Sequence, residues 1–186
     1  MGRRPGVLLD RDGTIIRDLG YLRQVEQIEI LPRVPEAIRL LSGAGLRLAV
    51  VTNQSAVGRG WLSDEELENI HREIKRRLAA DGAAVDRIYY CPHHPTEALG
   101  SYRVACDCRK PAAGMARRAA AELEMDLARS YVVGDQPTDM ELAARIGARG
   151  IRLGAEAVAA AGPDCVAATD LWEAANWIVE DLRRRL

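Results

Sequence analysis

The sequence predicts a three-layer α/β fold, in which a parallel sheet carries helices on both faces. Short continuous apolar runs, typical of strands buried on both faces, alternate along the chain with longer amphipathic segments. The chain has 186 residues, of which 48% are hydrophobic and 28% charged. This length and composition are ordinary for one globular domain, so we expect a single domain over residues 1–186.

The apolar runs place the strands, and the amphipathic segments place the helices. We expect strands at 7–9, 46–51, 87–90 and 131–133, and short edge strands at 150–153 and 165–168. We expect helices at 35–41, 64–80, 115–124, 139–146 and 170–186. The helix at 64–80 begins with a capping box, in which Ser63 is followed three residues later by Glu66. Its apolar face carries Leu67, Ile70, Ile74 and Leu78, and we expect His71 to face solvent.

Charge and hydropathy exclude several function classes. The 26 basic and 27 acidic residues leave a net charge of −1, which argues against a nucleic-acid partner. No apolar run reaches the length of a membrane span, and the run at 7–9 is too short for a signal peptide. We therefore expect a cytoplasmic protein with reduced thiols and no membrane partner. The apolar face of the C-terminal helix is expected to pack on its own domain, which favours a monomer.

Polar side chains end three of the predicted strands, at Asp10, Thr52 and Asp135. Ligands of parallel α/β sheets bind at the carboxyl ends of the strands, so these three residues lie where a binding or catalytic site is expected. Asp10 and Asp12 are two residues apart, and in extended chain both carboxylates can face one site. Two close carboxylates repel each other, and a hard divalent ion such as Mg²⁺ relieves that repulsion.

Three further segments can serve a phosphoryl group. Hydroxyl and amide side chains follow one another at Thr52, Asn53, Gln54 and Ser55, where they could hold phosphate oxygens. Lys110 precedes a helix and could neutralise a phosphoryl group during transfer. Asp139 lies four residues after Asp135, in the expected first turn of a helix.

In order and spacing, these segments resemble the four motifs of the haloacid dehalogenase-like phosphohydrolases, over about residues 7–147. The resemblance implies a Rossmann-like sheet and Mg²⁺-dependent hydrolysis of a phosphate monoester. It makes Asp10 the nucleophile that becomes an aspartyl-phosphate, and Asp12 the acid and base. Thr52 and Lys110 would hold the phosphoryl oxygens. Asp10, the backbone carbonyl of Asp12 and Asp135 would bind Mg²⁺.

Three cysteines and two histidines gather in the irregular stretch at about 91–111. Cys91 and His93 form one closely spaced pair, and Cys106 and Cys108 form another. Three thiolates and one imidazole make a closed tetrahedral zinc site, which is structural rather than catalytic. His94 is the alternative imidazole, and Cys165 is expected to pack in the core.

This loop resembles the zinc-loop branch of the superfamily, which contains heptose 1,7-bisphosphate 7-phosphatases and histidinol-phosphate phosphatases. The branch lacks a large cap domain and acts on small phosphorylated metabolites. The resemblance implies a pocket lined by Asp18, Gly20 and Tyr21, by residues 52–55, and by Arg109 beside Lys110. Arg59 is a further candidate for a second anionic group. The residue after Asp135, often basic in the branch, is here Gln136.

Three alternatives for the function follow from the same residues. The motifs serve heptose bisphosphate and histidinol phosphate equally, and we favour the former because Arg59 and the segment at Asp18–Tyr21 suit a doubly phosphorylated sugar. A non-catalytic zinc-stabilised module would have lost part of the catalytic set, yet all of it is present. A nucleic-acid end phosphatase would use the same chemistry, but the chain has no basic tract.

Overall fold

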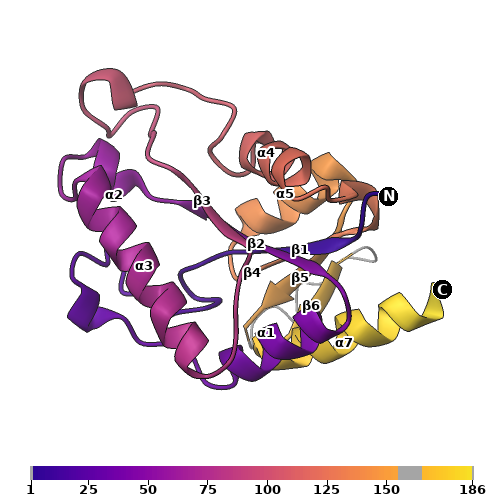
Figure 1. Ribbon diagram of the computed structural model, residues 1–186. Coiled ribbons are helices and arrows are strands. Elements are labelled where there is room, and N and C mark those ends of the chain that lie inside the picture. The colour runs from indigo at the N-terminus through magenta and orange to yellow at the C-terminus, as the bar shows by residue number, and fades with distance from the viewer. Residues whose placement is uncertain (1, 155–164, 186) are drawn as a thin grey trace.

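The computed structural model describes residues 2–154 and 165–185 and shows a six-stranded sheet between two layers of helices (Figure 1). The strand order is β3-β2-β1-β4-β5-β6, and every neighbouring pair is parallel. The strands are β1 (Gly6–Leu9), β2 (Arg47–Asn53), β3 (Arg87–Cys91), β4 (Tyr131–Gly134), β5 (Arg149–Leu153) and β6 (Cys165–Ala168). Because β1 lies between β2 and β4, residues that follow these three strands meet at one edge of the sheet.

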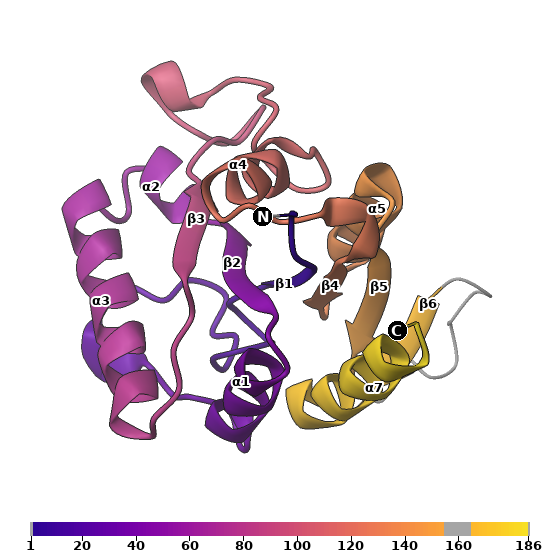
Figure 2. The same ribbon diagram turned by 45° about the vertical axis from the view of Figure 1, so that its right-hand side comes forward.

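Helices cover both faces of this sheet (Figures 1 and 2). The α-helices are α1 (Val34–Gly43), α2 (Ser55–Gly58), α3 (Asp64–Ala80), α4 (Gly114–Glu122), α5 (Pro137–Ile146) and α7 (Leu171–Arg184). Three short 3-10 turns are η1 (Val25–Gln27), η2 (Gly100–Tyr102) and η3 (Leu127–Arg129). No helix in the described ranges is both long and apolar enough to cross a membrane.

Alternate residues of the strands feed two separate cores. Val7 and Leu9 of β1 pack with α1, α3 and α7, whereas Leu8 points to the other face and packs with α4 and α5. All four residues of β1 and all four of β4 are buried. This explains why both strands appear in the sequence as continuous apolar runs rather than as alternating ones.

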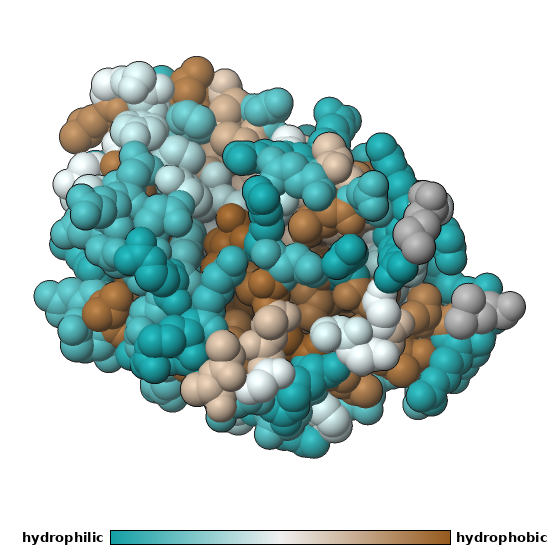
Figure 3. Space-filling model, in the orientation of Figure 1, coloured by the Kyte–Doolittle hydropathy of each residue, from teal (hydrophilic) through white to brown (hydrophobic). Residues whose placement is uncertain are grey.

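The helix ends follow from local chemistry. Ser63 accepts a hydrogen bond from the backbone N–H of Glu66, whose carboxylate accepts one from the N–H of Ser63, so the predicted capping box at the start of α3 is confirmed. Asp170 caps α7 in a similar way, by accepting from the N–H of Glu173. Hydrophilic residues cover most of the α3 surface seen in Figure 3, as expected for an amphipathic helix.

The predicted fold class is confirmed, and each predicted strand and helix is present with ends shifted by a few residues. Two expectations are wrong. The strand at 150–153 is not at an edge, because β5 pairs with both β4 and β6. His71 is not solvent-facing but only 4% exposed. The side chain of Cys165 and residue Leu186 lie outside what the structure describes.

Candidate functional site

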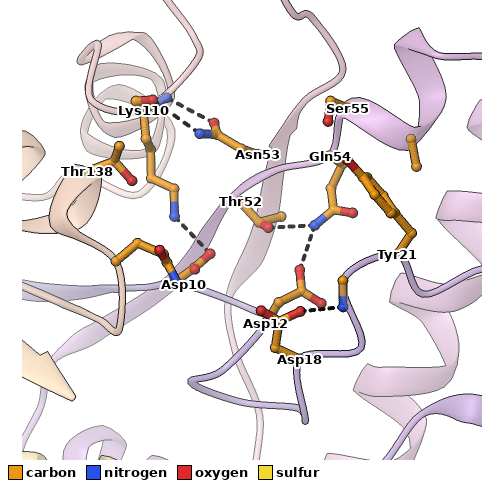
Figure 4. A pocket seen from close by; sticks show the side chains of 13 residues that line it. Asp10, Asp12, Asp18, Tyr21, Thr52, Asn53, Gln54, Ser55, Lys110 and Thr138 are labelled. Carbon is orange, nitrogen blue, oxygen red and sulfur yellow. Dashed lines mark hydrogen bonds and ion pairs between the residues drawn. The ribbon is translucent and has the colours of Figure 1, made fainter. Parts of the chain in front are cut away.

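A cavity of about 280 Å³ opens at the carboxyl ends of β1 and β2 (Figure 4). It brings together most residues that the sequence assigned to chemistry or to substrate. They are Asp10, Asp12, Asp18, Gly20, Tyr21, Thr52, Asn53, Gln54, Ser55 and Lys110, with Ala56, Gln136 and Thr138 in addition. Segments more than a hundred residues apart in the chain thus share one cavity.

Lys110 lies between two carboxylates at the base of this cavity. Its Nζ is 2.8 Å from Oδ1 of Asp10 and 2.7 Å from Oδ1 of Asp139. Asp139 is fully buried, and its other oxygen accepts a hydrogen bond from the backbone N–H of Gln136. Both oxygens of Asp139 therefore have partners, and this residue anchors Lys110 beside Asp10.

The backbone of Lys110 is held as firmly as its ammonium group. The Asn53 side chain donates to the carbonyl oxygen of Lys110 at 3.1 Å and accepts from its N–H at 2.9 Å (Figure 4). Asn53 was predicted to bind substrate, but its amide is occupied by these two bonds. It acts on the site by tying the end of β2 to the loop that carries Lys110.

The carboxylates of Asp10 and Asp135 offer a cation site, with the carboxylate of Asp139 close by. One oxygen from each lies within 4.8 Å of the others. Oδ1 of Asp135 is buried and finds no hydrogen-bond partner in the described part of the chain. Gly13 leaves room for this carboxylate, because a Cβ there would lie 2.5 Å from Oδ2 of Asp135. A buried, unpaired carboxylate oxygen among like charges fits a hard divalent cation.

Burial and mutual repulsion perturb the acidic groups of this site. Burial raises the pKa of Asp10 to about 6, with the Lys110 ammonium opposing the shift and Asp139 adding to it. Burial and the charge of Asp10 also raise the pKa of Asp135. Burial alone would lower the pKa of Lys110, but its two carboxylate partners outweigh burial and raise it. Lys110 is therefore a fixed positive charge at the site.

Hydrogen bonds from Arg11 and Gln54 hold the carboxylate of Asp12. Arg11 donates to both oxygens of Asp12, from Nη2 at 2.9 Å and from Nε at 3.1 Å. The amide of Gln54 donates at 2.8 Å to Asp12 and at 2.7 Å to the hydroxyl of Thr52 (Figure 4). Gln54 was predicted to bind substrate, and in the structure its side chain links Asp12 to Thr52.

The segment at 18–21 forms one wall of the cavity. Oδ1 of Asp18 accepts a hydrogen bond from the N–H of Gly20 at 2.7 Å. Gly20 has φ +74°, a conformation that glycine adopts without strain, and its Cα faces open space. This turn carries Tyr21 into the lining, where the residue is 39% exposed.

Two predicted substrate-binding arginines do not line the cavity. The guanidinium of Arg59 lies over the rings of Tyr21 and Trp61, at 5.5 and 4.9 Å from their centroids, and forms an ion pair with Glu97. Arg109 donates to the backbone oxygen of His93 at 3.0 Å. Arg59 thus supports an aromatic wall formed by Tyr21 and Trp61. Arg109 ties together two parts of its own loop between β3 and α4.

The loop between β3 and α4 brings three thiols and one imidazole together. The Sγ of Cys108 is 3.0 Å from that of Cys91 and 3.2 Å from that of Cys106. Nδ1 of His93 is 3.2 Å from the Cys108 sulfur. All four ligand atoms lie within 4.8 Å of one another, which is the arrangement of a metal site. His94 is not in this cluster, since its Nδ1 accepts from the N–H of Glu97.

Sequence reasoning missed the roles of Arg11 and His71. Arg11 is 1% exposed, and its Nη1 lies 3.3 Å from Nε2 of His71 in α3. The helical period could have revealed His71, because position 71 is four residues after Leu67 and three before Ile74, on the buried face. No comparable signal marks Arg11, whose place between Asp10 and Asp12 suggests an exposed turn.

Comparisons with known proteins agree with this geometry. The HAD-hydrolase-like family matches residues 107–183. The D-glycero-beta-D-manno-heptose-1,7-bisphosphate 7-phosphatase of Yersinia pestis is 37% identical over 180 residues, covering 96% of this chain and 91% of that protein. The enzyme of the same name from Escherichia coli K12 is 42% identical over 147 residues, covering 78% of this chain and 77% of its own.

A solved structure shows the same fold. The D,D-heptose 1,7-bisphosphate phosphatase from B. bronchiseptica, complexed with magnesium and phosphate, superposes with a TM-score of 0.83 at 31% identity. The match covers 95% of this chain and 99% of that one.

Proposed function

Since the chain belongs to the haloacid dehalogenase-like phosphatases, we propose that it hydrolyses the 7-phosphate of D-glycero-D-manno-heptose 1,7-bisphosphate with Mg²⁺ and an aspartyl-phosphate intermediate. The observation that carries this proposal is the meeting of Asp10, Lys110 and Asp135 at one end of the sheet. A nucleophile, a fixed positive charge and a cation site are what phosphoryl transfer requires.

In the first step, a carboxylate oxygen of Asp10 attacks the phosphorus, and the bond from phosphorus to the sugar oxygen breaks. Asp12 gives its proton to that oxygen, which leaves as the sugar hydroxyl. Lys110 and Thr52 donate to the phosphoryl oxygens as their charge redistributes. A carboxylate nucleophile divides one difficult displacement into two easier ones.

In the second step, the Asp12 carboxylate takes a proton from water, and the water oxygen attacks the phosphorus. The bond to Asp10 breaks, inorganic phosphate leaves, and Asp10 and Asp12 regain their starting forms. Asp10, Asp135 and the backbone carbonyl of Asp12 would hold Mg²⁺, which when bound neutralises charge on the phosphoryl group. Asp139 stays paired with Lys110 throughout.

We also propose that Cys91, His93, Cys106 and Cys108 hold a structural Zn²⁺. The four-ligand set is complete, so it leaves no open position for catalysis. Burial raises the pKa of the Cys91 thiol, and a bound cation would take the place of that proton. Three unbridged thiols suit a reducing compartment such as the cytoplasm.

Histidinol phosphate is the second candidate substrate, and one observation favours it. Among the described residues that line the cavity, Lys110 is the one cationic side chain, whereas Asp10, Asp12 and Asp18 are acidic. An amine on the distal part of the substrate would suit Asp18. The named relatives favour the heptose bisphosphate, and we give that greater weight.

Phosphate release from the two substrates at equal Mg²⁺ concentration distinguishes these candidates. We expect kcat/KM for heptose 1,7-bisphosphate to exceed that for histidinol phosphate by about 100-fold or more. The reverse order would assign the enzyme to the amine-bearing substrate. Similar, low values for both would mean that the true substrate is another phosphate monoester.

The nucleophile is tested with Asp10→Asn. An amide cannot form the acyl phosphate, so we expect kcat to fall by roughly 10³-fold or more with the fold intact. Asp81→Asn is the matched control, because Asp81 is exposed at the end of α3, at the opposite end of that helix from Ser63. Phosphatase activity that survives Asp10→Asn would overturn the aspartyl-phosphate mechanism.

A further inference from the structure

Arg11 is a buried cation that the proposed mechanism does not use. Only 1% of its surface is exposed, although it directly follows the nucleophile. Its guanidinium contacts acceptors from three different parts of the chain: Asp12, Gln54 after β2, and His71 in α3. Because the guanidinium is enclosed, its orientation is fixed, and it fixes the orientation of the side chains to which it donates hydrogen bonds.

What Arg11 holds is the carboxylate of Asp12. Nη2 donates to Oδ1 at 2.9 Å and Nε donates to Oδ2 at 3.1 Å, which is the two-pronged arrangement that fixes a carboxylate plane. The Gln54 amide donates to Oδ2 as well, and Nη2 of Arg11 donates to Oε1 of the same Gln54. Asp12, Arg11 and Gln54 thus form a closed triangle of hydrogen bonds.

His71 supplies the contact that closes the far side of the guanidinium. Its Nε2 is 3.3 Å from Nη1, and its ring lies 5.7 Å from that of Tyr90. Burial and the neighbouring Arg11 charge lower the pKa of His71 to about 3, so the ring is neutral and Nε2 is free to accept. Without this acceptor, Nη1 would be a buried donor with no partner among the residues that the structure describes, which is costly.

We propose that Arg11 is the positioning residue for the acid–base carboxylate of Asp12, and that His71 holds Arg11 in place from α3. The inference rests on the proposed function, in which Asp12 protonates the leaving oxygen. Proton transfer needs the carboxylate within hydrogen-bond reach of that oxygen, and a displacement of about 1 Å can cost roughly 10²-fold in rate.

The test compares two phosphate esters with different leaving groups. The sugar oxygen of heptose bisphosphate needs a proton as it leaves, whereas para-nitrophenolate is stable without one. We expect Arg11→Gln to lower kcat/KM for the heptose ester by about 100-fold and for para-nitrophenyl phosphate by less than about fivefold. A variant that merely weakened the fold would lower both values by the same factor.

The variants at His71 separate positioning from packing. His71→Leu fills the space but cannot accept a hydrogen bond, so we expect the same selective loss, of about 10-fold. His71→Gln retains an acceptor and should recover to within about threefold of the wild-type value. Ile74→Val in the same helix is the control, since it shortens a buried side chain of α3 and removes none of the hydrogen bonds of Arg11.

Equal loss on both esters, or no loss in Arg11→Gln, would overturn the inference. If wild-type protein cleaved neither ester, the proposed function would be wrong, and crystal structures of Arg11→Gln and His71→Leu would decide the inference alone. A displaced Asp12 carboxylate supports positioning by Arg11. A carboxylate that keeps its bond to Gln54 in both variants contradicts it.

Discussion

Gly134 is the residue that lets Asp139 reach Lys110. A Cβ at position 134 would lie 2.1 Å from Oδ2 of Asp139 and 2.3 Å from its Cγ. Gly134 ends β4 and is buried, so the carboxylate cannot move aside into solvent. The last residue of this strand is therefore glycine because a side chain there would push the anchor of Lys110 out of the site.

We predict that Gly134→Ala displaces Asp139 and destabilises the protein by about 1–3 kcal/mol, the usual cost of overpacking. It should also lower phosphatase activity, because Lys110 loses one of its two carboxylate partners. Urea unfolding and phosphate release measure the two effects. Gly43→Ala is the control, because a Cβ at this exposed end of α1 meets nothing within 4 Å. Equal behaviour of the two variants would contradict the steric argument.

At the scale of single residues, sequence reasoning identified side chains more reliably than it assigned their tasks. Asp10 and Thr52 lie together as predicted, because strand ends in a parallel sheet share an edge, and the loop before α4 brings Lys110 to the same cavity. Asn53 and Gln54 face the same hollow, but their amides bind Lys110, Asp12 and Thr52. The hydrogen-bond partner of each amide belongs to a segment that is distant in the chain, so the spacing of residues in the sequence cannot predict it.

Among the elements, the loop between β3 and α4 has little regular structure beyond η2 and is anchored to segments about 40 residues away in the chain. Leu99 donates from its N–H to the carbonyl of Gly58 at 2.7 Å, and a Cβ at Gly58 would lie 2.3 Å from the backbone oxygen of Pro92. The hydroxyls of Tyr90 and Tyr102 both donate to Asp64 at the start of α3. The loop is thereby fastened to α2 and α3, beside the aromatic wall of the cavity.

The surface of this loop is partly apolar. Hydrophobic residues appear at the surface of the loop that carries η2 in Figure 3, and Leu99 and Val104 are 64% and 43% exposed. With so little of its apolar surface buried, the loop depends on its anchors and on the cysteine–histidine cluster for order. A metal in that cluster would supply folding energy that the loop lacks.

We predict that a strong zinc chelator loosens residues 91–111 before the sheet. Amide hydrogen exchange should rise first in that loop, and the melting temperature should fall by several degrees, as about 1–2 kcal/mol of lost stability would produce. Cys106→Ser is the control, since a protein that already lacks a ligand should respond little to the chelator. An unchanged melting temperature in the wild-type protein would argue against a structural metal.

At the scale of the whole molecule, continuous apolar runs alternating with helices were enough to predict a parallel sheet with ligands at its carboxyl edge. They could not give the strand order, which places Asp10 between Thr52 and Asp135, because pairing depends on contacts across the sheet. They also misplaced the strand at 150–153 at an edge. That strand, β5, lies between β4 and β6, and β6 begins only at Cys165. No local sequence pattern shows that β6 pairs with the outer side of β5.

The buried His71 links the catalytic end of the sheet to the acid stability of the whole fold. Its pKa is lowered from 6.5 to about 3 by burial, by Arg11 and by Lys75. Between these two pH values the imidazole is therefore protonated in the unfolded chain and neutral in the folded one. Above pH 6.5 the imidazole is neutral in both states and contributes no pH dependence. Between pH 6.5 and about 3, stability therefore falls as pH falls, by at most about 1.4 kcal/mol per pH unit.

We predict that wild-type protein loses about 1–1.5 kcal/mol more stability than His71→Gln between pH 7.5 and 5.5. The two proteins share every other titrating group, including Asp10 with its raised pKa, so the difference between them isolates the imidazole. Urea unfolding at the two pH values measures it, with Mg²⁺ left out so that metal binding does not add to either curve. Parallel stability curves for the two proteins would mean that His71 is as accessible to protons in the folded state as in the unfolded one. That result would also remove the neutral acceptor on which the orientation of Arg11 depends.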